Sequence, residues 1–172
     1  MIFNHYSSDN FVLDKSKIYK LKRYYNLKPR GLWLSKGSDW ELWCVKQEYG
    51  LNRLNVCNKV KINMKNILLI KDKDQLIDFS NEFKLEEEIF ITNINWKNVR
   101  KIYDGIYIDL CHCIFDAYFW FCYWDVPSAC IWNLSSVEYF GPENTAIEAD
   151  HRLIDFQAAV NADVSNGQFI NA

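Results

Sequence analysis

The spacing of apolar positions divides most of this chain into short elements. Side chains alternate between apolar and polar at 2–7, 31–35, 55–71 and 106–110, which predicts strands, with one or two of them in 55–71. Apolar residues recur every three or four positions in four other segments, which predicts helices. These helices are expected in the C-terminal half of 11–27, from Ser38 or Asp39 to Gly50, from Asp72 or Asp74 to Phe83, and at 96–103. Since the elements do not follow regular βαβ units, we predict an α+β fold.

The most apolar stretch is 119–133, FWFCYWDVPSACIWN. It holds three of the seven tryptophans and a single carboxylate, Asp125. Its β-branched and aromatic residues predict two buried strands with a corner at Pro127, the second continuing to Phe140. Because burying an unpaired carboxylate is costly, Asp125 is either a turn or capping residue or an acidic group at the floor of a cleft.

The composition of the chain changes after Gly141-Pro142. Aromatic residues become rare, and alanine and asparagine become frequent. We therefore expect one domain at 1–142, followed at 143–172 by a helix over 148–160 and a tail whose last ten residues are mobile.

Composition narrows the class of protein. Hydrophobic residues make up 49% of the 172 residues and aromatic residues 16%, which excludes a disordered chain. The net charge of −2 gives no general signal for a nucleic-acid binder. The sequence contains no run of 18 apolar residues, so no membrane span is predicted. The N-terminus MIFNHYSSDN lacks the features of a signal peptide. Six scattered cysteines favour free thiols in a reducing cytoplasm, with a secreted effector that lacks a classical signal as the alternative.

The usual catalytic and metal-binding motifs are missing. There is no Gly-x-Ser-x-Gly, no Gly-x-Gly-x-x-Gly and no Walker loop. The Cys-His-Cys run at 111–113 has no second cluster to complete a zinc site, so no metal is predicted. His5 on its strand is either a structural residue or a ligand-binding one. The pair Trp40 and Trp43 fits a helix that packs into the core, with a ligand-binding aromatic pair as the alternative.

Three short motifs follow one another along the chain. The first is His-Tyr-Ser-Ser at 5–8, and the second is Gly-Leu-Trp-Leu-Ser at 31–35, preceded by Pro29. The third is Trp-Asp-x-x-Ser-x-x-Ile-Trp-Asn at 124–133. The order of these motifs resembles ADP-ribosyltransferase domains of the diphtheria-toxin and poly-ADP-ribose-polymerase type, and the resemblance covers about residues 3–140.

This resemblance implies two small antiparallel sheets splayed around a cleft that binds NAD as a substrate. His5 would hydrogen-bond the ribose on the nicotinamide side, and Ser7 would help to fix that ribose. Trp33 would stack on the nicotinamide ring in place of the family's tyrosine. Gly31 and Ser35 complete the expected NAD-binding set.

The acidic residue is where the chain departs from the family. The family's glutamate opens the strand of the third motif, a position that falls at or near Ser128. Asp125, three residues earlier, is the only nearby carboxylate, and our hypothesis is that it takes the acidic role. A carboxylate stabilises the oxocarbenium-like charge that develops when the nicotinamide–ribose bond breaks, and it orients the 2′-hydroxyl.

Two functions follow from the resemblance. The chain is a toxin-like mono-ADP-ribosyltransferase, a glycosyltransferase that modifies a protein or nucleic-acid acceptor, or it is an inactive domain of the same fold that binds NAD, a nucleotide or a partner. An unrelated α+β interaction module and a nucleic-acid-binding module without chemistry are the alternatives outside the family. A toxin-like activity would also imply a neutralising partner protein, and no membrane partner is expected.

Overall fold

The computed structural model describes residues 1–21, 27–85, 93–112 and 118–142. The chain divides into two units, Met1–Gly141 and Pro142–Ala172. Apart from Pro142, the second unit lies outside the described residues, and so do the helix predicted at 148–160 and the tail. In the described part the strands are β1 (Ile2–Ser7), β2 (Leu32–Ser35), β3 (Val56–Ile62), β4 (Ile67–Ile70), β5 (Gly105–Ile108), β6 (Ser128–Ile131) and β7 (Val137–Pro142), and the helices are α1 (Asp39–Lys46), α2 (Lys73–Phe83) and α3 (Trp96–Ile102).

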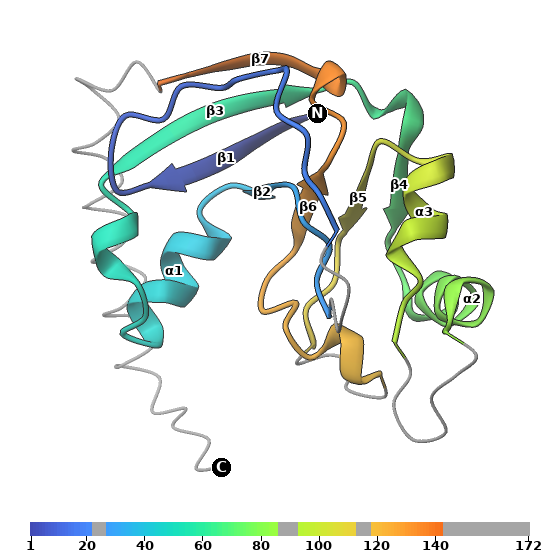
Figure 1. Ribbon diagram of the computed structural model, residues 1–172. Coiled ribbons are helices and arrows are strands. Elements are labelled where there is room, and N and C mark those ends of the chain that lie inside the picture. The colour runs from blue at the N-terminus through green and yellow to red at the C-terminus, as the bar shows by residue number, and fades with distance from the viewer. Residues whose placement is uncertain (22–26, 86–92, 113–117, 143–172) are drawn as a thin grey trace, which may run out of the picture. The chain divides into compact units, whose positions relative to one another are not determined.

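The described strands form one curled sheet in the order β4-β5-β6-β2-β1-β3-β7, so the predicted α+β class is confirmed. The two separate antiparallel sheets that the resemblance implies are not confirmed, because the strands share one sheet and β4 pairs with β5 in parallel. β1 pairs with β3 at six positions, from Ile2 opposite Lys61 to Ser7 opposite Val56. With β2 it shares a single pair, Asn4 opposite Ser35. The sheet therefore has two limbs that meet at one pair: a first limb of β1, β3 and β7, and a second limb of β2, β4, β5 and β6. In Figure 1 the first limb runs across the top, and β4, β5 and β6 run downward from it.

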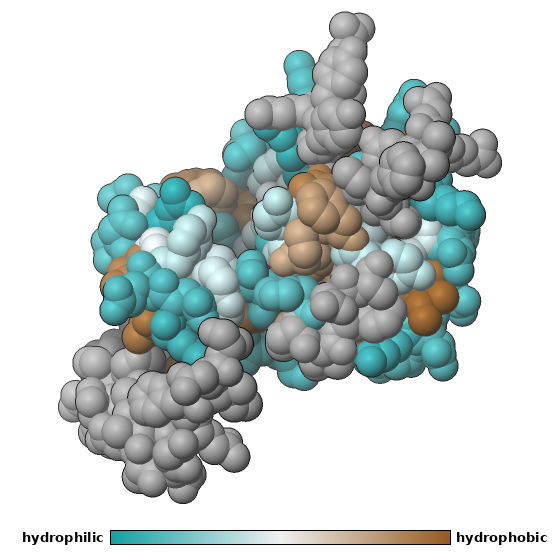
Figure 2. Space-filling model, turned by 90° about the horizontal axis from the view of Figure 1, so that it is seen from below, coloured by the Kyte–Doolittle hydropathy of each residue, from teal (hydrophilic) through white to brown (hydrophobic). Residues whose placement is uncertain are grey.

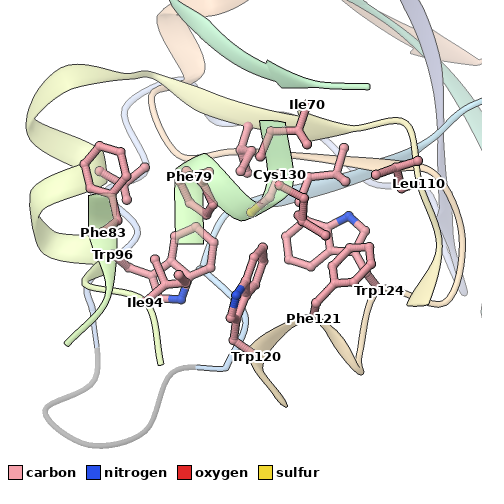
Figure 3. Packing of buried hydrophobic residues seen from close by; sticks show 14 of the residues in the cluster. Ile70, Phe79, Phe83, Ile94, Trp96, Leu110, Trp120, Phe121, Trp124 and Cys130 are labelled. Atoms are coloured by element: carbon pink, nitrogen blue, oxygen red, sulfur yellow. The ribbon is translucent and has the colours of Figure 1, made fainter. Parts of the chain in front are cut away.

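Buried side chains form a separate core on each face of this sheet. We call them the indole core and the aliphatic core. The indole core packs α2, α3 and the segment around Trp120 against β4, β5 and β6, and Figure 3 shows its indole rings close together. The aliphatic core includes Phe3, Leu32 and Leu34. Because side chains alternate along β2, Trp33 faces the indole core while its two neighbours face the other. Most of the coloured surface in Figure 2 is hydrophilic, with hydrophobic areas at the middle, at the right edge and on the left of that view.

Most of the predicted elements are confirmed. The strands at 2–7, 31–35 and 106–110 correspond to β1, β2 and β5, and 55–71 forms two strands. The capping prediction for α2 is correct, because the Asp72 side chain accepts a hydrogen bond from the Gln75 backbone N–H at 2.9 Å. α1 begins at Asp39 as expected but ends at Lys46 rather than at Gly50. Glu48 stops it by adopting a left-handed backbone conformation with φ of 51°.

The two strands predicted in 119–140 are wrong in part. The first half forms a 3-10 turn at Phe119–Phe121, because Trp120, Phe121 and Trp124 all bury in the indole core, which helical spacing permits and strand alternation does not. The second half is β6, which ends at Ile131 instead of Phe140. A turn at Leu134–Ser136, capped by the side chain of Asn133, separates it from β7.

No helix forms in the described part of 11–27. Asp14 closes a local turn instead, because its Oδ1 accepts hydrogen bonds from the Ser16 backbone N–H at 2.9 Å and from its Oγ at 2.6 Å. Residues 22–26, which belong to the same prediction, lie outside the described residues.

The cysteines also differ from expectation at one position. Cys44, Cys57, Cys122 and Cys130 are free. Cys111 is disulfide-bonded, so the expectation of free thiols is wrong there, because pairing depends on proximity that a cysteine count does not give. Within the described residues, no helix combines the length and apolar character needed to cross a bilayer.

Candidate functional site

A cavity of about 280 Å³ lies where the two limbs of the sheet meet. Five of the residues that the sequence analysis selected contribute to its wall: His5, Trp33, Ser35, Asp125 and Ser128. The rest of the wall comes from Asn4, Tyr6, Lys28, Leu34, Trp40, Arg53 and Val126.

Three neighbouring strands supply a row of polar side chains to this cavity. Asn4 of β1 lies opposite Ser35 of β2, which lies opposite Ser128 of β6. Directly paired residues point to the same face of a sheet, so these three side chains share the face that carries Trp33. The Ser35 hydroxyl is buried and, within the described residues, has no hydrogen-bond partner. Since an unsatisfied buried hydroxyl is costly, a ligand that bonded it would recover that free energy.

His5 also lines the cavity, but it lies on the other face of β1 from this row of side chains. Alternation along β1 directs its ring to the face opposite that of Asn4, where it packs 5.0 Å from the ring of Phe11 and 5.8 Å from that of Phe140. Its Nδ1 lies 3.0 Å from the carbonyl oxygen of Trp33, where β1 and β2 separate. A carbonyl oxygen only accepts, so Nδ1 carries the hydrogen, and in the neutral ring Nε2 is left as an acceptor. Burial lowers the pKa of His5, which favours this neutral form.

The lowered pKa of His5 makes stability depend on pH. In the unfolded chain His5 takes up a proton near its ordinary pKa of 6.5, whereas the folded chain does so only at lower pH. The unfolded state therefore binds more protons as the pH falls below that value, and the free energy of unfolding decreases. We expect urea unfolding to show a larger loss of stability between about pH 7.5 and about pH 5.5 for the wild type than for His5→Gln. Equal losses in the two proteins would contradict this.

Asp125 lies at the cavity wall between two basic side chains. Its Oδ2 is 3.9 Å from Lys28 Nζ, and its Oδ1 is 3.9 Å from His112 Nδ1. Lys28 Nζ also lies over the Trp33 ring, 4.8 Å from the ring centroid. Burial lowers the pKa of Lys28, and the charge of Asp125 opposes that shift. The carboxylate, the ammonium group and the indole thus form one contiguous group in the wall.

A hydrogen-bond network ties the first limb to α1 beside the cavity. The Asn4 side chain donates to the Tyr6 hydroxyl at 3.2 Å and to the Gly37 carbonyl at 2.7 Å. The Tyr6 hydroxyl donates to Glu41 Oε2 at 3.1 Å, and burial raises the pKa of Tyr6. The sequence analysis did not select Asn4 or Tyr6. Alternation along β1 would have identified them, had the register between β1 and β2 been known.

Two predicted site residues do not line the cavity. Ser7 Oγ instead donates to the Asp9 carbonyl at 2.8 Å, in an exposed hydrogen bond at the end of β1. Gly31 has a packing role, because a Cβ there would lie 2.6 Å from both the Cys130 sulfur and the Ile131 carbonyl oxygen.

The tryptophans of α1 belong to neither core cluster. Trp40 stacks on Trp43 with ring centroids 5.1 Å apart, and Tyr49 packs edge-on against both. Trp40 also lines the cavity, which favours the ligand-facing alternative for this residue. Among the described residues, no group of three or more histidine, cysteine, aspartate or glutamate side chains could hold a metal ion.

Comparisons of the chain with protein-family models, with curated proteins and with solved structures found no match. Function is therefore inferred from the residues of the cavity and from their geometry.

Proposed function

We propose that this chain is an NAD-dependent mono-ADP-ribosyltransferase that modifies a protein or nucleic-acid acceptor. One observation carries the proposal: the strands of the three motifs are neighbours in the sheet, in the order β6-β2-β1, and His5, Trp33, Asp125 and Ser128 line one cavity. The motifs are far apart in sequence, so their meeting is a property of the fold. The strands form one sheet instead of the two that the resemblance implies, and the cavity lies where its two limbs meet.

In this proposal the cavity holds the nicotinamide riboside end of NAD. The volume of about 280 Å³ is at the lower end for ligand sites, so the rest of the dinucleotide extends outside it. Trp33 supplies a flat apolar face for the nicotinamide ring. His5 Nε2 accepts a hydrogen bond from a ribose hydroxyl, and the unpartnered Ser35 hydroxyl gains a partner. Arg53, also in the wall, suits a phosphate.

The transfer reaction develops positive charge on the ribose of NAD, and the site must hold a group that stabilises this charge. The bond between C1′ and the nicotinamide nitrogen breaks, and nicotinamide leaves with the bonding pair. A nucleophile of the acceptor forms the new bond to C1′ and releases its proton to solvent. Positive charge builds on the ribose ring before that bond is complete. The carboxylate of Asp125 stabilises this charge, which is the role that a glutamate at Ser128 would otherwise have.

A second function, binding of NAD without transfer, is favoured by a different observation. Asp125 has a basic side chain 3.9 Å away on each side, and a serine opens β6. The ammonium group of Lys28 reduces the field with which this carboxylate stabilises a cationic ribose. If Lys28 and His112 stayed in these positions with NAD bound, the domain would bind the dinucleotide but transfer slowly.

Incubation with NAD labelled in the adenylate part, together with a cell lysate, tests the proposal. We expect label to enter macromolecules, and treatment with proteinase or with nuclease then identifies the class of acceptor. NAD should also raise the melting temperature of the purified protein. A rise in melting temperature without label or free nicotinamide would support binding alone, and neither effect would contradict both functions.

A further inference from the structure

The face of Trp33 that lines the cavity is covered by a side chain of the protein itself. Lys28 Nζ lies 4.8 Å from the centroid of the Trp33 ring and 5.8 Å from that of Trp124. Asp125 Oδ2 lies 3.9 Å from the same nitrogen. Two indole faces and a carboxylate attract positive charge, so these three groups form a cation site with the Lys28 ammonium in it.

The walls of this site are fixed more firmly than its occupant. Trp124 is fully buried, and its ring packs 4.9 Å from that of Trp33, which holds Trp33 in place. Lys28 is held through a flexible four-carbon stem, and its side chain is 34% exposed. The stem can therefore turn the ammonium group out to water, and the indole and carboxylate walls remain.

A ligand that replaces Lys28 must interact favourably with the same indole rings and the same carboxylate. A neutral ring would stack on Trp33 but would leave Asp125 without the ammonium group beside it, and removing one partner of a partly buried ion pair is unfavourable. A cationic ring restores both the attraction to the indole faces and the attraction to the carboxylate. The site therefore discriminates by charge as well as by shape.

We propose that the surface formed by Trp33 and Asp125, with Trp124 buried behind it, is a subsite for a cationic aromatic ring, which Lys28 occupies until such a ligand displaces it. The ligand class is a pyridinium or a similar ring with a fixed positive charge. Its identification as the oxidised nicotinamide ring of NAD, in preference to the neutral reduced ring, rests on the proposed function.

Binding of two small probes tests the subsite without any transfer reaction. 1-Methylnicotinamide carries a fixed positive charge, and nicotinamide is its neutral counterpart. Each is titrated into wild type, Lys28→Ala and Lys28→Arg, with calorimetry as the measurement. Lys28→Ala should bind 1-methylnicotinamide about threefold to thirtyfold tighter than wild type, the range set by the loss of one competing cation–π contact. The affinity for nicotinamide should increase by a smaller factor. Lys28→Arg should bind both probes with affinities close to those of wild type, because it keeps a cation over Trp33.

Two results would overturn the proposal. If Lys28→Ala did not bind 1-methylnicotinamide more tightly, Lys28 would not be a competing occupant. If the affinities for the two probes increased by the same factor in Lys28→Ala, the subsite would not select for charge. Thermal melts of each variant verify folding, and Lys28→Met, which keeps the apolar stem and loses the charge, should shift affinity in the same direction as Lys28→Ala.

The outcome is separable from that of the proposed function. Charge-selective binding in a protein that transfers no ADP-ribose would leave the subsite standing and refute the transferase. Transfer of ADP-ribose by a protein whose Lys28→Ala variant binds the two probes no differently from wild type would refute the subsite alone.

Discussion

Replacing Asp125 by asparagine should lower the rate of ADP-ribose transfer at least about a hundredfold. Asparagine keeps the size of the side chain and removes the charge that would stabilise the cationic ribose. Of the residues that the structure describes, Asp125 alone contributes a carboxylate to the wall of the cavity. The transfer of label at saturating NAD, measured for purified wild type and variant, checks this expectation.

Glu138→Gln is the matched control. Glu138 is also ion-paired, with 3.1 Å between its Oε2 and Lys61 Nζ, but it does not line the cavity. The control should transfer at the wild-type rate, and both variants should melt near the wild-type temperature. An Asp125→Asn protein that kept wild-type transfer would move the acidic role to another residue, with Glu41 at the end of the Tyr6 network as the next to test.

Trp120→Ala should reduce the free energy of unfolding by about 3–5 kcal/mol, the range for removal of a large aromatic side chain from a core. Trp120 is fully buried in the indole core, where its ring packs against those of Phe79, Trp96 and Trp124. The change also removes the hydrogen bond from Trp120 Nε1 to Ser80 Oγ at 3.1 Å. Urea denaturation followed by far-ultraviolet circular dichroism measures the loss.

Phe119→Ala provides the comparison from the same turn. Phe119 is 48% exposed, so its removal leaves no cavity in the core and should cost about 1 kcal/mol or less. If the two substitutions cost the same, the burial of the 119–124 segment described above would be wrong.

Elements that depend on local patterns could be predicted from the sequence. The alternation in 31–35 defines β2 and correctly separates Trp33 from Leu32 and Leu34. Asp72 begins α2 because a capping carboxylate acts on the backbone only three residues away. The failure at 119–124 has a local cause as well: aromatic residues favour strands on average, but three of them at helical spacing can fill one core from a single turn.

Features that depend on register could not be predicted. Whether His5 or Asn4 faces Trp33 is decided by the pairing of Asn4 with Ser35, and a shift by one residue would exchange them. Lys28 could not be predicted as a site residue from the sequence, for a related reason. It precedes Pro29 in an irregular segment, and only the folded chain brings it over Trp33 and beside Asp125. The assembly of Asp125, Trp33 and Ser128 in one wall agrees with the order of motifs, while their chemical roles stay predictions.

The two limbs of the sheet are joined at a single residue pair between β1 and β2, and residues of both limbs line the cavity. The first limb contributes His5, Asn4 and Tyr6, and the second contributes Trp33 and Ser128. On one face the aliphatic core holds the limbs together, because Phe3 of β1 packs 5.0 Å from the ring of Tyr107 of β5. The hydrogen bond from His5 Nδ1 to the Trp33 carbonyl spans the joint itself at 3.0 Å. His5 therefore couples the two walls of the cavity through one side chain, so its loss would be felt on both.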